Sequence, residues 1–121
     1  MAASGLVISQ IQGVTVVNLQ NTSILDAATT EAIAAELFAL TDQQAQRKLV
    51  LDFSAVRFFS SQLIGVLIAL DKKARAIKGR VVLCGLRADL FRIFQIMNLH
   101  KKLNFTEDEE KALNSFDVFT C

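Results

Sequence analysis

Two adjacent serines, Ser60 and Ser61, stand where an apolar helix is expected to begin. Serine is among the best residues for capping a helix N-terminus, so the hydroxyl of Ser60 is expected to accept a hydrogen bond from a backbone N–H one turn into the helix. A helix N-terminus also offers free N–H groups and a partial positive charge, which would accommodate a phosphate on Ser61. The pair therefore predicts a helix cap combined with a candidate phosphoacceptor.

Other side chains of reactive type have simpler interpretations. His100 is the only histidine and lies at the expected exit of a helix, so it is predicted to cap that helix or to titrate in solvent. Cys84 lies inside an apolar run, which is typical of a buried core residue. Together with Cys121 at the last position, it forms neither a zinc-site spacing nor a disulfide framework.

The sequence does not favour an enzyme. The short motifs typical of nucleotide-binding, hydrolase, metalloprotease and redox proteins are all absent. An enzyme that uses Ser61 as nucleophile and His100 as base is the least favoured alternative, because no nucleophile elbow surrounds the serine. No metal site and no cofactor are predicted.

Composition indicates one globular domain over residues 1–121. Of the 121 residues, 52% are hydrophobic and 21% are charged, and the net charge of +1 does not suggest a nucleic-acid-binding protein. The first residues lack the pattern of a signal peptide, and the longest apolar run, Leu63–Leu70, is shorter than the roughly 20 residues of a membrane span. With its two cysteines, the chain is expected in the reducing cytoplasm, away from membranes.

Charge is distributed unevenly along the chain. Residues 47–102 contain twelve basic residues against three acidic ones. Several of the basic residues, such as Lys72, Arg75 and Lys78, fall where a helix would surface and end, which favours solvated helix ends. An anionic partner for this basic segment is the alternative.

Alternating and helical hydrophobic patterns follow one another in a regular order. A hairpin is predicted from Leu6–Ile11 and Val14–Leu19, with Gln12 and Gly13 at its turn. Further strands are expected at Lys48–Phe53, at Arg80–Cys84 and, as a short one, at Leu103–Phe105. Strands that alternate with helices through short connections predict an α/β fold, with a mixed sheet of four to five strands and about four helices packed against it.

Four helices are expected between and after these strands. The first follows Asp26, a plausible N-cap, and carries Ile33, Leu37 and Leu40 on one face. The second follows the two serines and ends at Gly79. Its Gly65 lies in a stretch that is apolar on all sides, which predicts a closely approaching neighbour.

The last two helices are shorter. One carries Leu90, Phe94 and Met97 and is closed by Asn98 in the left-handed conformation. The other is predicted from a capping box at Thr106 and Glu109, with Leu113 and Phe116 on its apolar side.

In these features the chain resembles the STAS family, the domain shared by bacterial anti-sigma factor antagonists and the cytoplasmic parts of sulphate transporters. The resemblance spans nearly the whole chain. It is carried by the opening hairpin and by the ordered segments ILDAATTEAIAAELFAL, LVLDFSAVRFFSSQLIGVLIAL, GRVVLCGL and LNFTEDEEKAL.

The resemblance implies a regulatory protein without catalytic activity. Such a protein docks on an anti-sigma factor, often a serine kinase of the histidine-kinase-like ATPase type, and releases a sigma factor until it is phosphorylated. By this resemblance Ser61 matches the phosphoacceptor, Asp26 matches an acidic residue near it, and Ser60 replaces the usual acidic residue just before it. Gln62 and Leu63 replace small residues usual after the acceptor.

The implied partner-binding surface comprises Asp26, Ser60, Ser61 and Gln62, and Ser60 is a second candidate phosphoacceptor. The alternative is a scaffold subunit that is never phosphorylated and that assembles with copies of itself or related domains, so a homo-oligomer is also considered.

Overall fold

The chain opens with a hairpin formed by strands β1 (Leu6–Ile11) and β2 (Val14–Leu19), as predicted. In the computed structural model, which describes residues 5–114, the two strands pair antiparallel in full register. Gln12 and Gly13 connect them with φ angles of 52° and 83°. Two left-handed residues are what a tight two-residue hairpin turn requires, and glycine adopts this conformation without strain.

The rest of the main sheet is parallel. Strands β4 (Lys48–Asp52), β6 (Arg80–Cys84) and β7 (Asn104–Thr106) extend the hairpin in the order β1-β2-β4-β6-β7. β2, β4, β6 and β7 all run in the same direction, so their carboxyl ends meet at one edge of the sheet. The predicted mixed sheet of an α/β fold is confirmed, with the last strand displaced by one residue from its expected position.

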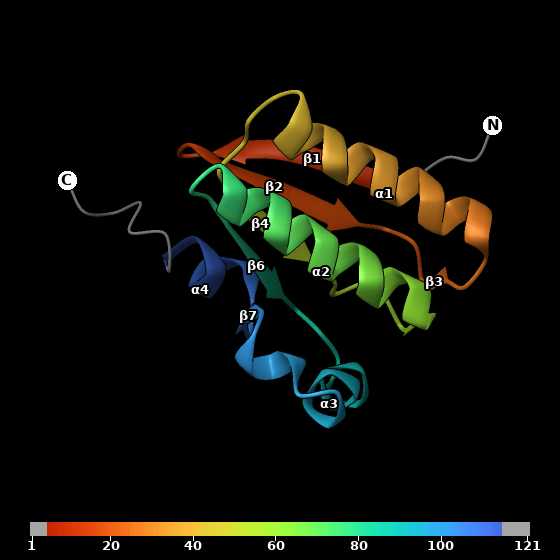
Figure 1. The fold of residues 1–121 in the computed structure, drawn as a ribbon. Coiled ribbons are helices and arrows are strands. Elements are labelled where there is room, and N and C mark those ends of the chain that lie inside the picture. Colours follow the sequence, from red (N-terminus) through yellow and green to blue (C-terminus); the bar gives the residue numbers. More distant parts are fainter. Residues whose placement is uncertain (1–4, 115–121) are drawn as a thin grey trace.

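Two long helices cover one face of this sheet (Figure 1). They are α1 (Ala27–Asp42) and α2 (Ser61–Ala76), which also pack against each other. Each helix turns a stripe of leucine and isoleucine side chains into the main core: Ile33, Leu37 and Leu40 from α1, and Leu63, Ile64, Leu67 and Leu70 from α2. The predicted apolar face of the first helix is therefore confirmed.

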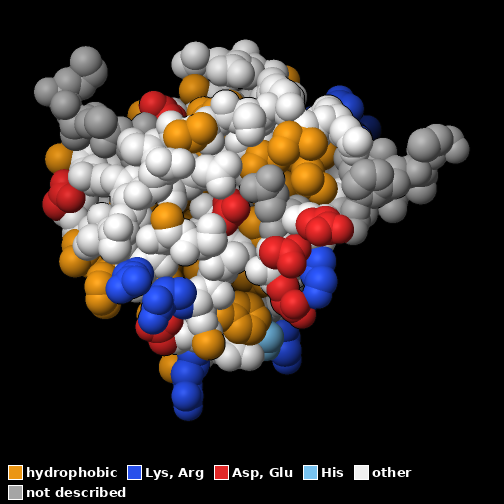
Figure 2. Space-filling view, turned by 180° about the vertical axis from the view of Figure 1, so that it is seen from behind, with side chains coloured by type: hydrophobic (Ala, Val, Ile, Leu, Met, Phe, Trp, Pro, Cys, Tyr) orange, Lys and Arg blue, Asp and Glu red, His pale blue; other side chains and the backbone are white. Residues whose placement is uncertain are grey.

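A short helix, α4 (Glu109–Asn114), lies against the opposite face, where it contacts β4, β6 and β7. Seen from behind, this side of the molecule carries acidic side chains next to basic ones, together with several groups of hydrophobic side chains (Figure 2). The predicted capping box is wrong, because the Lys111 N–H donates to the Asp108 carboxylate at 2.9 Å. Thr106 is still part of β7, so the helix begins later than expected. Phe116 and Cys121 lie outside the described residues.

The remaining helix, α3 (Ala88–Ile96), follows β6 and leads into a 3-10 turn, η1 (Leu99–Lys101). Leu90 and Phe94 are buried as predicted, but Met97 is 48% exposed, because the helix has ended before it. Asn98 has a φ of 63°, which confirms the expected left-handed residue at this point.

Gly65 differs from its prediction. It lies on the exposed side of α2, and a Cβ atom added there would meet nothing within 4 Å. The apolar residues around it in the sequence are divided between buried and half-buried positions, so the helix is not enclosed on every side.

A second, very small sheet was not predicted. Its strands β3 (Ser23–Ile24) and β5 (Phe58–Phe59) pair in parallel, one just before α1 and the other just before α2. Two residues are too few to produce a recognisable alternating pattern.

Candidate functional site

The N-termini of α1 and α2 lie side by side because β3 and β5 join the segments that precede them (Figure 1). The Arg57 N–H donates to the Thr22 carbonyl at 2.8 Å, and the Ser60 N–H donates to the Ile24 carbonyl at 3.0 Å. Asp26 follows Ile24 by two residues. The structure therefore brings together the two parts of the predicted site, which are far apart in the sequence.

Asp26 caps α1 as expected. Its Oδ2 accepts the Thr29 N–H at 2.9 Å, and its carbonyl accepts the Thr30 hydroxyl at 2.9 Å. The hydrogen bonds from Thr29 favour the ionised carboxylate and lower the pKa of Asp26 below its ordinary value. Asp26 is thus an exposed, negatively charged group at this edge.

Ser60 occupies the N-cap position of α2, but it does not cap the helix with its side chain. Its Oγ is buried and has no hydrogen-bond partner among the described residues. In contrast to the predicted cap, the bonds of Ser60 come from its backbone: its N–H donates to the Ile24 carbonyl, and its own carbonyl accepts the Leu63 N–H at 3.1 Å. The residue is held by its main chain, while its hydroxyl is turned inward.

Ser61 is the first residue of α2, and both it and Gln62 are exposed. Because the Ser60 side chain bonds no N–H of the first turn, this helix start remains available to an anion. Of the two candidate phosphoacceptors, only Ser61 has a position accessible to another protein. Leu63, the next residue but one, is fully buried in the core.

Exposed apolar side chains flank this site, and the sequence analysis did not identify them. Leu25, just before Asp26, and Phe58, in β5, are each 58% exposed. Phe59 instead turns inward, with its ring edge-on to those of Phe53 and Phe94 at centroid distances of 6.4 and 5.8 Å. The sequence did contain a signal for an exposed phenylalanine here. Neighbouring residues of a strand point to opposite sides, so of the adjacent Phe58 and Phe59 only one could face the core.

The other reactive groups are placed elsewhere. His100 lies in η1 and lines a hollow with Arg80 and Asn104, to which neither Ser60 nor Ser61 contributes. Cys84 is fully buried in β6, in agreement with its prediction as a core residue. Within residues 5–114, no cluster of three or more His, Cys, Asp or Glu side chains could hold a metal ion.

None of the helices in the described part of the chain is both long and apolar enough to cross a membrane.

Comparison with families of known proteins gives a match over most of the chain. A family model described as STAS domain matches residues 6–112. A Bordetella bronchiseptica protein named as an anti-sigma factor antagonist, BtrV, is 28% identical over 111 residues, which make up 92% of this chain and 93% of BtrV.

Solved structures share the same fold. An anti-sigma-factor antagonist (STAS) domain protein from Planctomyces limnophilus has a TM-score of 0.81 at 21% identity, over 94% of this chain and 98% of the other. The anti-sigma factor antagonist SpoIIAA in its unphosphorylated form has a TM-score of 0.72 at 17% identity, over 96% and 99% of the two chains. The phosphorylated form of Bacillus SpoIIAA gives 0.71 at 19% identity, over 92% and 98%.

Proposed function

This chain belongs to the STAS domain family, and from that premise we propose that it acts as an anti-sigma factor antagonist. It binds an anti-sigma factor, a serine kinase of the histidine-kinase-like ATPase type, through the surface formed by Asp26, Ser61 and Gln62. Phosphorylation of Ser61 ends this binding. The chemistry of phosphoryl transfer belongs to the partner.

The exposed position of Ser61 at an open helix start is the observation that carries the proposal. A phosphate there would add a charge of about −1.5 to −2 at neutral pH. Free N–H groups and the positive end of the helix dipole stabilise such a charge locally. We therefore expect phosphorylation to leave the fold intact. In support, the unphosphorylated and phosphorylated forms of SpoIIAA match this chain with nearly equal TM-scores.

The surroundings of Ser61 explain why the added charge would release a partner. Leu25 and Phe58 expose apolar surface that a docked protein would cover. Asp26 already makes this edge negative. A second negative group would have to lose its water at the interface beside a like charge, which opposes binding.

Mass spectrometry tests the phosphorylation site. The protein is incubated with ATP and, one at a time, with each histidine-kinase-like ATPase that its genome encodes, and the intact mass is followed. Wild type should gain one phosphoryl group and Ser61→Ala none. Ser60→Ala, whose lost hydroxyl is buried, serves as the matched control and should be modified like wild type. A phosphate on any residue other than Ser61 would contradict the proposal.

Calorimetry tests the consequence for binding. Ser61→Glu should weaken binding to the ATPase that phosphorylates wild type at least tenfold, about 1.4 kcal/mol, and leave the melting temperature nearly unchanged. Gln44→Glu adds the same charge at an exposed residue near the opposite end of α1 and should bind like wild type. Equal affinity of Ser61→Glu and wild type would contradict the switch. If light scattering then shows self-association, the unphosphorylated scaffold becomes the better assignment.

A further inference from the structure

A hollow of about 500 Å³ lies between the second half of α2 and the segment around η1. Its size falls within the range of small-molecule binding sites, roughly 300–1,000 Å³. Leu99 and Leu103, both largely buried, form part of its apolar lining. It contains none of the residues of the proposed docking surface, so the inference drawn from it does not depend on the proposed function.

Positive side chains line this hollow from both sides. Lys72 and Arg75 come from α2, and Lys101 and Lys102 come from η1 and the residue that follows it. The one carboxylate in the lining, Asp71, is buried and paired with Arg75. The hollow therefore has a clear excess of positive charge.

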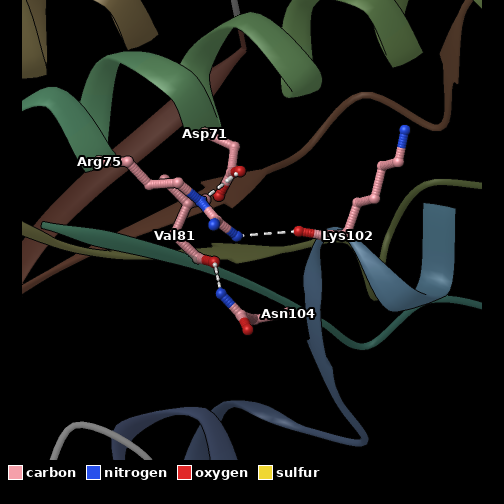
Figure 3. A network of polar contacts seen from close by, with 5 residues as sticks. All are labelled: Asp71, Arg75, Val81, Lys102 and Asn104. Atoms are coloured by element: carbon pink, nitrogen blue, oxygen red, sulfur yellow. Dashed lines mark hydrogen bonds and ion pairs between the residues drawn. The ribbon is translucent and has the colours of Figure 1, made fainter.

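Arg75 fixes the two sides of the hollow relative to each other (Figure 3). Its Nε donates to Asp71 Oδ2 at 2.8 Å, and its Nη2 donates to the carbonyl of Lys102 at 3.0 Å. Just beyond, Asn104 Nδ2 donates to the carbonyl of Val81 in β6 at 3.2 Å. These hydrogen bonds hold the walls of the hollow in place without a ligand, and together they form its frame. The Lys102 ammonium extends away from the Arg75 contact.

Three lysines of the hollow lack an ion pair. Among the described residues, no carboxylate lies within ion-pair distance of Lys72, Lys101 or Lys102. By contrast, Lys73, the neighbour of Lys72, pairs with Asp42 at 2.9 Å and lies over the ring of Phe38. Ammonium groups gathered around one concave surface repel one another, and an anion between them would relieve that repulsion.

We propose that this hollow binds a soluble ligand that carries two linked phosphate groups. Cations on opposite walls suit a diphosphate better than a single phosphate, because each phosphate can then meet ammonium groups of its own. Since Arg75 is already bonded to Asp71 and Lys102, the lysines are the groups that contact the ligand. A concave surface with a fixed frame favours a small molecule over a flat macromolecular surface.

Calorimetric titration with inorganic pyrophosphate tests this proposal. Wild type should bind it saturably, with one ligand per chain, and more weakly as the salt concentration rises. The double variant Lys101→Gln, Lys102→Gln should lose at least tenfold in affinity. Both substitutions keep the backbone carbonyl that Arg75 bonds, so the frame should persist, and thermal unfolding followed by circular dichroism checks that it does.

A matched control separates a site from general attraction to a basic protein. Lys48→Gln, Arg92→Gln removes the same charge from exposed residues outside the hollow and should change the affinity less than twofold. The proposal is overturned if wild type does not bind pyrophosphate or if both double variants lose affinity equally. It is also overturned if the protein binds only vesicles of phosphatidylcholine and phosphatidylglycerol.

Phosphorylation of Ser61 is measured on the same variants. Because Lys101 and Lys102 lie outside the proposed docking surface, their double variant should be phosphorylated like wild type. Failure of the diphosphate site and failure of the proposed function are therefore distinguishable.

Discussion

The two helix N-termini of the candidate site have almost the same backbone and opposite side-chain arrangements. Asp26 before α1 has φ −87° and ψ 152°, and Ser60 before α2 has φ −87° and ψ 165°. Yet Asp26 accepts the Thr29 N–H with its carboxylate, whereas the Ser60 hydroxyl is buried and bonds no N–H of its helix. Backbone geometry therefore permits a cap without determining whether the side chain forms it.

Solvent access accounts for the difference. Asp26 is exposed, and the charge of its carboxylate is stabilised by turning back to the helix start. Ser60 follows β5 directly and is half-buried, with its N–H bonded to the Ile24 carbonyl. The first turn of α1 is thus capped by the Asp26 side chain. The first turn of α2, which contains Ser61, has no side-chain cap.

Removing the buried link between the two helix starts should have the largest effect. Ile24 is fully buried in β3, so Ile24→Ala should lower the free energy of unfolding by about 2–4 kcal/mol in a denaturant titration. The neighbouring Leu25 is 58% exposed, and Leu25→Ala should change it by less than about 0.5 kcal/mol. Equal costs for the two variants would contradict this account of the link.

The Asp26 cap should have a smaller effect, which depends on pH. At neutral pH, Asp26→Ala should lower the melting temperature, and Asp26→Asn should lower it less, because asparagine still caps a helix. The folded protein lowers the pKa of Asp26, so the stabilisation is present above the ordinary pKa of aspartate, about 3.9. It is lost as the pH falls through the lower folded-state value.

Melting temperatures of wild type and Asp26→Asn, measured from pH 7 down to ~2, test the direction of this pH dependence. The advantage of wild type should disappear at the acidic end. An advantage that grows in acid would show that the carboxylate is not the stabilising form.

A substitution at Gly65 should stabilise the protein instead. This residue lies in α2, the helix that lacks a side-chain cap. Its exposed position leaves room for a Cβ, so Gly65→Ala should raise the free energy of unfolding by about 1 kcal/mol. A denaturant titration measures this gain. If Gly65→Ala destabilised the protein, the sequence-based prediction of a closely approaching neighbour at Gly65 would be right instead.

The smallest effect is expected at Ser60. Because its hydroxyl has no partner and its backbone bonds do not need the side chain, Ser60→Ala should change the free energy of unfolding by less than about 0.5 kcal/mol. The same titration on Asp26→Ala provides the comparison. A loss as large as that of Asp26→Ala would mean that Ser60 caps its helix after all.

Sequence patterns predicted the fold where they extended over several residues. The turn at Gln12 and Gly13 and the periodic apolar face of α1 were sufficient to place those elements. The capping box at Thr106 failed because Asp108, two residues later, provides an equally suitable oxygen. Which of two neighbouring polar residues caps a helix depends on where the preceding strand ends.

The candidate site was predicted less completely. Asp26 and Ser61 were named from the sequence, and the structure brings their helix starts together. The inward turn of the Ser60 hydroxyl and the exposure of Leu25 and Phe58 depend on β3 and β5, which are too short to leave a pattern. Local sequence patterns could not predict features that depend on the pairing of residues far apart in the sequence.

The brevity of β3 and β5 also has a consequence for the motions of the molecule. A pair of two-residue strands is only marginally stable by itself, whereas β4 is held between β2 and β6 in the centre of the main sheet. Amide hydrogens bonded across the small sheet, such as those of Arg57 and Ser60, should therefore exchange with deuterium through local opening. Those of β4 should exchange only when the whole chain unfolds. The edge that carries Ser61 can thus loosen and close again while the sheet beneath it stays folded.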